Sequence, residues 1–148
     1  MEREAPELAA RARALFEAHR HKTMATLRKD GSPRISGIEL EFRDGDVWFG
    51  SMWRAVKALD LQRDPRFAIH SGSDDPDAWN GDAKIAGRAE EMTDREVAED
   101  EGDDEPSEPS HSFRLDISEL SVVRLGEPRD HLVIESWHEG RGVTSLRR

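Results

Sequence analysis

The sequence contains no cysteine, no tyrosine and no long apolar run among its 148 residues. Without cysteine there is no disulfide, no thiolate nucleophile, and no thiolate-bound zinc or iron–sulfur cluster. No apolar stretch approaches the roughly 20 residues that a membrane-spanning helix needs, and the charged N-terminus lacks the apolar segment of a secretory signal. We therefore expect a cytoplasmic protein that does not associate with membranes.

Negative charge is concentrated in one segment. Residues 74–108 carry 15 acids and 3 bases, and the rest of the chain carries 17 acids and 19 bases. The formal net charge of −10 therefore conceals a slightly basic body, which does not repel anionic small ligands. No stripe of lysine and arginine interleaved with aromatic residues is present, so we expect no nucleic-acid partner.

The spacing of apolar residues predicts two helices among many short strands. One helix is expected over 6–20, and a second from Ser51 or Met52 to Asp64, with Val56, Leu59 and Leu61 facing inward. Period-two alternation and turn residues predict strands over 23–28, 33–42, 47–50, 67–71, 83–92, 112–117, 120–125 and 131–137. Residues 139–148 have little pattern. The prediction is an α+β, mainly β fold built on an antiparallel barrel.

The length fits a single domain over residues 1–148. The segment at about 94–110 is too acidic and too rich in proline to pack, so we expect a mobile excursion there. The six histidines show no metal-ligand spacing, and we expect no metal site. Trp48 and Trp137 alternate with apolar residues and are expected in the core, as is Trp53, although Trp53 could instead cover a bound ring.

A phosphate site is one interpretation of residues 49–66, FGSMWRAVKALDLQRDPR. Arg54 and Lys57 are three residues apart in the first turns of the predicted helix, where the helix dipole disfavours cations. An anionic phosphate would relieve that repulsion, because free N–H groups and the Ser51 hydroxyl would also point at it. An ordinary amphipathic helix with a solvated polar face is the alternative.

The strand SPRISG, residues 32–37, changes character along one face. Arg34 and Ser36 share that face with Ile38 and Leu40, so polar groups precede core residues. This arrangement suits the edge of a ligand site. Fraying at a strand end, with Arg34 in water, is the alternative.

The order of these pieces resembles the pyridoxamine 5′-phosphate oxidase-like split-barrel flavoproteins. The resemblance runs over roughly residues 8–87 and is carried by MATLRKDGSPRIS, a strand ending in FGS, then R-x-x-K and a leucine before RDPR. It implies a six-stranded antiparallel split barrel with short flanking helices, a homodimer, and FMN or a deazaflavin bound at the subunit interface. Arg34, Ile35 and Ser36 resemble the strand along the flavin ring, and Ser51, Arg54 and Lys57 resemble the phosphate clamp.

Three departures from the oxidases bear on the substrate. Asp82 stands where they have a flavin-contacting glutamine, Ser145–Arg147 replaces their Arg-x-His motif, and no tyrosine is present to hold a substrate phosphate. The resemblance therefore implies FMN-mediated hydride transfer to or from a different, unidentified small molecule, and no catalytic residue is assigned. The alternatives are a deazaflavin-dependent reductase, with Arg63 and Arg66 as further cations for its acidic tail, and a non-enzymatic flavin-binding, haem-binding or interaction protein.

Overall fold

A computed structural model describes residues 3–92 and 109–148. Within these residues an antiparallel sheet of nine strands is accompanied by two helices, so the mainly β, α+β prediction is confirmed. The elements are α1 (Pro6–Ala18), β1 (Lys22–Leu27), β2 (Pro33–Ile38), β3 (Glu41–Arg43), β4 (Asp46–Met52), α2 (Val56–Arg63), β5 (Arg66–His70), β6 (Asp82–Met92), β7 (Ser110–Leu125), β8 (Leu132–His138) and β9 (Gly142–Arg147).

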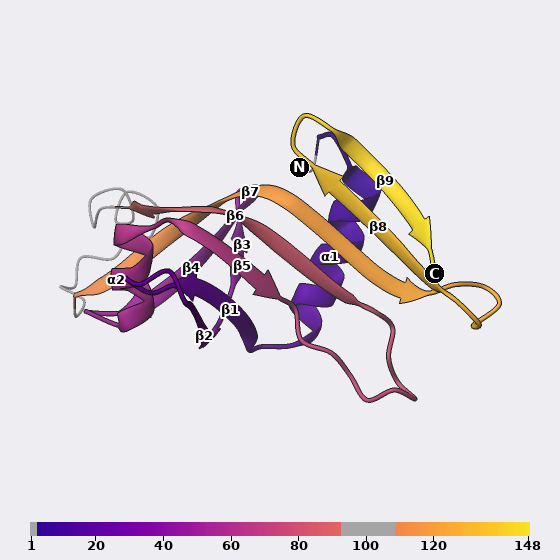
Figure 1. Cartoon of the computed structure of the whole chain (residues 1–148), viewed down its shortest axis with the longest axis horizontal. Coiled ribbons are helices and arrows are strands. Elements are labelled where there is room, and N and C mark those ends of the chain that lie inside the picture. Colours follow the sequence, from indigo (N-terminus) through magenta and orange to yellow (C-terminus); the bar gives the residue numbers. More distant parts are fainter. Residues whose placement is uncertain (1–2, 93–108) are drawn as a thin grey trace.

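Six of the strands form the wall of the split barrel. They pair in the order β2-β1-β5-β6-β7-β4, while β3 extends β4 as a short hairpin (Figure 1). The outer strands β2 and β4 come close together, but no backbone ladder joins them in the described residues. The predicted six-stranded split barrel therefore corresponds to these six strands, and β8 and β9 form an additional ribbon that continues from β7.

The long strand β7 connects the barrel to the ribbon. Its first part pairs with β4 over Ser110–Leu115 and its last part with β8 over Glu119–Leu125, while β6 runs along its other edge. We predicted two strands here because the polar pair at 118–119 interrupts the apolar pattern. A register shift between Ala86 and Gly87 of β6 lies opposite that point and lets β7 continue unbroken.

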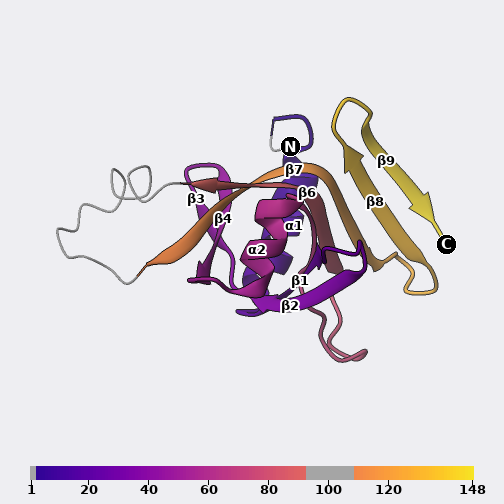
Figure 2. The same cartoon turned by 60° about the vertical axis from the view of Figure 1, so that its left-hand side comes forward.

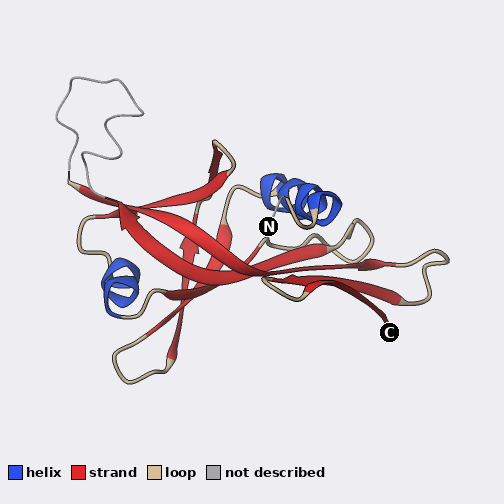
Figure 3. Cartoon of the chain, turned by 90° about the horizontal axis from the view of Figure 1, so that it is seen from above, coloured by secondary structure: helices blue, strands red, loops and turns tan. Residues whose placement is uncertain are grey.

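Helix α1 packs on β6 and β7 at the end of the sheet away from α2 (Figure 3). Pro6 occupies its first turn, as predicted, and its buried side chains are Leu8, Ala9, Ala12 and Phe16. Trp137 of β8 lies in the core, and its indole N–H donates to Glu4 Oε2 at 3.0 Å. This bond fastens the ribbon to the N-terminal end of α1.

Helix α2 differs from its prediction in both start and orientation. It begins at Val56, because β4 continues through Met52 and a turn follows before the helix. Val56 and Leu59, which we expected to face inward, are 53% and 43% exposed, whereas Leu61 is buried as predicted. Successive residues of a helix are rotated by about 100° about its axis. A helix that starts at a later residue therefore leaves β4 with different positions facing the sheet.

Other segments also differ from their predictions. The predicted strand 33–42 is broken into β2 and β3 after Ile38, and residues 139–148, for which we predicted no element, include β9. Trp48, expected in the core, is half-buried beneath Arg43. The predicted acidic excursion at 94–110 lies outside the described residues except for its last two positions, and Ser110 already belongs to β7. Neither helix in the described part of the chain is long and apolar enough to cross a membrane.

Candidate functional site

The predicted ligand residues lie around one corner of the barrel, formed by β2, the end of β4 and the start of α2. In Figure 2, α2 lies next to the hairpin made by β1 and β2, above it in that view. Lys57 in the first turn of α2 extends to β2, where its Nζ lies 3.5 Å from the Gly37 carbonyl oxygen. Ser36 is half-buried next to that carbonyl, on the same face as Arg34. The structure therefore brings Arg34, Ser36 and Lys57 to neighbouring positions.

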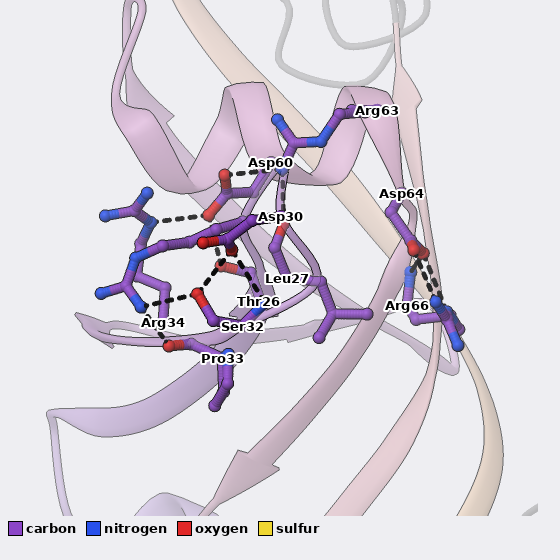
Figure 4. Close-up of polar contacts among 11 residues, drawn as sticks. Thr26, Leu27, Asp30, Ser32, Pro33, Arg34, Asp60, Arg63, Asp64 and Arg66 are labelled. Atoms are coloured by element: carbon purple, nitrogen blue, oxygen red, sulfur yellow. Dashed lines mark hydrogen bonds and ion pairs between the residues drawn. The ribbon is translucent and has the colours of Figure 1, made fainter.

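Arg34 is held by a buried carboxylate and does not extend freely into water. Its Nε donates to Asp60 Oδ2 at 2.6 Å, and the same oxygen accepts a bond from the Thr26 hydroxyl at 2.9 Å (Figure 4). Arg63 donates to the other oxygen, Oδ1, at 3.0 Å. The Asp60 side chain is only 3% exposed. The alternative in which a strand end frays is therefore wrong, because Arg34 links β2 to α2.

The pKa of Asp60 reflects two opposing effects. Burial by itself raises the pKa of this carboxyl, but the hydrogen bonds from Arg34, Arg63 and Thr26 together outweigh burial and hold its pKa below the ordinary value. Asp60 is thus an ionised group inside the protein, neutralised by two arginines. Sequence reasoning missed it, because we expected Val56 and Leu59 to face inward, whereas the structure buries Ala58 and Asp60.

A cavity of about 680 Å³ lies between the β1–β2 turn and α2. Apolar side chains of α2 and mostly cationic side chains of the hairpin form its walls. Its lining residues are Arg28, Lys29, Asp30, Arg34, Val56, Leu59, Asp60 and Arg63. Arg34 is the one predicted ligand residue in that lining, so the cavity adjoins the corner that holds Lys57.

Ser51 and Arg54 occupy the turn region between β4 and α2. Ser51 is 7% exposed, and its hydroxyl oxygen is buried without a hydrogen-bond partner among the described residues. Arg54 precedes the helix and has the left-handed backbone angle φ of 59°, which costs a non-glycine residue about 1–2 kcal/mol. The prediction that Arg54 and Lys57 share one helical face is therefore wrong, and the helix-dipole argument applies to Lys57 alone.

A histidine that sequence reasoning did not select holds this turn in place. His111 of β7 is 4% exposed, and its Nε2 accepts the Arg54 backbone N–H at 3.0 Å. The Trp53 indole stacks on the His111 ring with centroids 4.8 Å apart and an interplanar angle of 11°. Trp53, which we expected to pack in the core, is 56% exposed. No local sequence signal connects residues so far apart along the chain.

Two further predicted positions do not add a side chain to the face that carries Arg34 and Ser36. Ile35 points to the opposite face of β2 from Arg34 and is 74% exposed. Asp82 begins β6 opposite Val123, whereas Met92 at the other end of β6 lies opposite Ser112, next to His111. Within one copy of the chain, Asp82 therefore lies at the end of β6 away from this corner.

The model of the pyridoxamine 5′-phosphate oxidase family matches residues 8–124. The chain belongs to the pyridoxamine 5′-phosphate oxidase family. The matched range begins within α1, ends one residue before the end of β7, and contains α2, the other five barrel strands and all six predicted ligand residues. No match was found among curated proteins.

Solved structures with similar folds include three proteins of different character. The first is PhzG from Burkholderia lata 383 in complex with tetrahydrophenazine-1-carboxylic acid, with a TM-score of 0.73, 15% identity, and 98% of this chain and 92% of that chain covered. The second is a pyridoxamine 5′-phosphate oxidase-related, FMN-binding protein from Nostoc punctiforme PCC 73102. Its TM-score is 0.65 at 15% identity, and 97% of this chain and 96% of that chain are covered. The third is a heme-binding protein from Mycobacterium smegmatis. Its TM-score is 0.64 at 17% identity, and 96% of this chain and 88% of that chain are covered. At these identities the likeness shows the shared fold.

Proposed function

We propose that this protein binds FMN at the corner of β2, β4 and α2 and is an FMN-dependent oxidoreductase acting on a small molecule. The observation that carries the proposal is a set of three donor groups at this corner that can bind an anion, although Lys57 Nζ also lies 3.5 Å from the Gly37 carbonyl oxygen. The side chains of Arg54 and Lys57 have no acidic partner among the described residues, and the buried Ser51 hydroxyl has no hydrogen-bond partner there. A phosphate group fits these donors, because it offers charge to both cations and acceptors to the hydroxyl.

The flavin ring would lie along β2, with FMN supplying the hydride-transfer chemistry when bound. Arg34 uses its Nε for Asp60, and its two terminal nitrogens have no partner among the described residues. These nitrogens can donate hydrogen bonds to a ring carbonyl while Asp60 fixes the guanidinium. The β2 backbone on either side of Ile35 would position the ring edge.

Two observations favour FMN over the alternative cofactors. A deazaflavin with an acidic tail would need cations beyond the clamp, but Arg63 is bonded to Asp60 and Arg66 to Asp64. A haem needs an axial ligand such as a neutral histidine nitrogen, and both ring nitrogens of His111, the histidine at the corner, are engaged. FMN is the cofactor whose phosphate matches two cations without an acidic partner and a buried hydroxyl without a hydrogen-bond partner among the described residues.

We also propose that the protein is a homodimer. Large apolar side chains are exposed around the same corner, namely Ile35, Met52, Trp53, Val56 and Leu59. Exposed apolar groups gathered near the unpaired edge of β2, and near the part of β4 beyond its pairing with β3, favour association with a second copy. Such a dimer would cover the open side of the proposed flavin site.

The absorption spectrum of the purified full-length protein tests the choice of cofactor. We expect flavin bands, whereas deazaflavin or haem bands would contradict FMN. A protein purified without any cofactor would then be titrated with FMN. The proposal fails if micromolar FMN does not bind.

Variants of the clamp test the phosphate assignment. A charge-assisted contact contributes about 1.5–3 kcal/mol, so Lys57→Ala or Arg54→Ala should weaken FMN binding roughly tenfold or more. Riboflavin, which lacks the phosphate, should bind the variants and the wild type equally. Lys84→Ala, which removes an exposed cation from β6, is the matched control and should leave FMN binding unchanged. Wild-type FMN affinity in both clamp variants would show that the phosphate lies elsewhere.

A further inference from the structure

His111 is fixed on three sides at the end of the barrel that contains the proposed phosphate site. Its Nε2 accepts the backbone N–H of Arg54, so the neutral ring carries its proton on Nδ1 and donates it to Glu91 Oε1. The other oxygen of Glu91 accepts a bond from the Gln62 side chain of α2 at 2.8 Å. Both ring nitrogens are thus engaged, and the ring is nearly fully buried. These contacts leave the imidazole one orientation.

The bond to Arg54 acts on a backbone in a costly conformation. Arg54 is one of two non-glycine residues with positive φ in the described part of the chain. Such a conformation persists where the surroundings hold it in place. His111 supplies that restraint through Nε2, and the stacked Trp53 ring supports the preceding residue. The restraint acts on the backbone, and the Arg54 side chain remains without an acidic partner among the described residues.

The left-handed residue also determines where the helix begins. Ala55 donates its N–H to the Met52 carbonyl at 3.0 Å and caps α2, so the turn at 52–55 directs the chain from β4 into the helix. A change of φ at Arg54 would move its side chain relative to Lys57, which lies in the first turn of α2. The geometry of the two cations therefore depends on the bond to His111.

We infer that His111 is a positioning residue of the phosphate site, which holds the Arg54 backbone so that Arg54 and Lys57 bind the same phosphate. This inference rests on the proposed function. His111 touches neither phosphate nor ring in this role and acts through Arg54. The groups that face the imidazole are Glu91 from β6, the Arg54 N–H and Trp53 from the turn, and Phe113 from its own strand.

Two substitutions separate the acceptor function of His111 from its packing. His111→Gln retains an acceptor, because its Oε1 can take the place of Nε2, whereas His111→Leu fills similar space without one. We expect His111→Leu to weaken FMN binding about tenfold and to leave riboflavin binding unchanged. His111→Gln should bind FMN within about threefold of the wild type. Equal losses for FMN and riboflavin in His111→Leu would show a merely structural role and overturn the inference.

A double-mutant cycle tests whether His111 acts through Arg54. In the Arg54→Ala background, His111→Leu should cause no further loss of FMN affinity, since the side chain that it positions is already absent. Additive losses would overturn the inference. Thermal unfolding of each variant verifies that the comparison is made on folded protein.

Amide hydrogen exchange of the ligand-free protein distinguishes failure of this inference from failure of the proposed function. The Arg54 amide should exchange slowly in the wild type and in His111→Gln, and at least tenfold faster in His111→Leu. If wild-type protein binds FMN and riboflavin equally, the phosphate site is refuted even where the exchange pattern is as expected. If FMN is preferred but the Arg54 amide exchanges equally in all three proteins, the role of His111 is refuted and the phosphate site stands.

Discussion

Asp60 is the residue on which the arrangement of β2 and α2 most depends. Its carboxylate is almost fully buried and accepts hydrogen bonds from Thr26, Arg34 and Arg63. A buried charge is costly unless it is paired, so removing either side of such an arrangement destabilises the fold. Arg34 consequently has two roles, since it anchors β2 and is also a candidate ligand residue.

Replacing this carboxylate should measurably destabilise the protein. We expect Asp60→Asn to lower the free energy of unfolding by about 2–3 kcal/mol at pH 7, below the usual cost of breaking a fully buried pair because both arginines are partly exposed. Urea denaturation measures the loss. Asp64→Asn removes the carboxylate of the solvent-exposed pair with Arg66 and should cost clearly less. Equal losses in the two variants would contradict the importance given to Asp60.

Stability should decrease in acid because several aspartates have lowered pKa values in the folded state. Hydrogen bonds from the Arg66 side chain and backbone lower the pKa of Asp64 to about 2, and the pKa of Asp60 is also below its ordinary value. An unfolded aspartate has a pKa of about 3.9, so the unfolded chain binds protons first as the pH falls. The stabilisation is therefore complete above about pH 5 and is lost between about pH 4 and 2.

Urea midpoints measured at pH 7, 5, 4 and 2 check this pH dependence. The midpoint should change little from pH 7 to 5 and fall steeply below pH 4. Asp64→Asn should reduce the fall between pH 4 and 2, since that residue no longer titrates. A midpoint independent of pH in this window would contradict the assignment.

The pairing of β6 with β7 requires a glycine at one position. A Cβ added at Gly87 would lie 1.9 Å from the Asp116 carbonyl oxygen, where the register of the two strands shifts. In contrast, a Cβ at Gly37 of β2 would meet no atom within 4 Å. The register shift that lets β7 pair with both β4 and β8 therefore leaves no room for a side chain at position 87.

Gly87→Ala should destabilise the protein by about 2–3 kcal/mol, because the two backbones must move apart. Gly37→Ala should change the free energy of unfolding by less than about 0.5 kcal/mol. Thermal or urea denaturation of both variants measures the difference. Wild-type stability in Gly87→Ala would mean that the ladder tolerates a wider spacing than the structure has.

The sequence allowed most elements to be predicted, because their patterns are local. The apolar spacing of α1, the turns after Leu27 and Arg43, and the alternation in β5 and β6 all concern neighbouring residues. The start of α2 was misplaced because a left-handed Arg54 cannot be read from its own sequence. The unbroken β7 was also missed, since its continuity depends on Gly87 in another strand.

The candidate site was predictable to a similar degree and for the same reason. Ser51, Arg54 and Lys57 lie within a single short stretch, so their order alone suggested a common role. Asp60 contacts Arg34 and His111 contacts the Arg54 backbone, and the fold brings these partners together. Long-range pairing of this kind leaves no periodic signal in the sequence.

At the scale of the whole molecule, the proposed flavin site and the C-terminal ribbon lie at opposite ends. Helix α2 is at one end of the sheet, and α1 with β8 and β9 is at the other (Figure 1). Exposed apolar residues occur at both ends, including Val56 near the corner and Val143 on the ribbon. The two ends can therefore be tested separately for a role in association.

A charged substitution near the corner should disrupt the proposed homodimer. Val56→Glu places an acid in the first turn of α2, where the helix dipole favours it, so the fold should tolerate the change. We expect wild-type protein to sediment as a dimer at micromolar concentration and Val56→Glu to sediment mainly as a monomer. Val143→Glu is the matched control on the ribbon and should remain a dimer. A wild-type monomer with FMN still bound would contradict the proposal.

The position of β7 late in the chain has a consequence for synthesis on the ribosome. β4 is made early, yet its partner along Val47–Met52 is Ser110–Leu115, which the ribosome adds some sixty residues later. Until then, one edge of β4 has no strand beside it, and Ser51 and Arg54 lack the neighbouring His111. A nascent chain that ends before Ser110 should therefore expose that edge to chaperones and bind no flavin. Translation must pass β7 before the barrel can close and the proposed cofactor site can form.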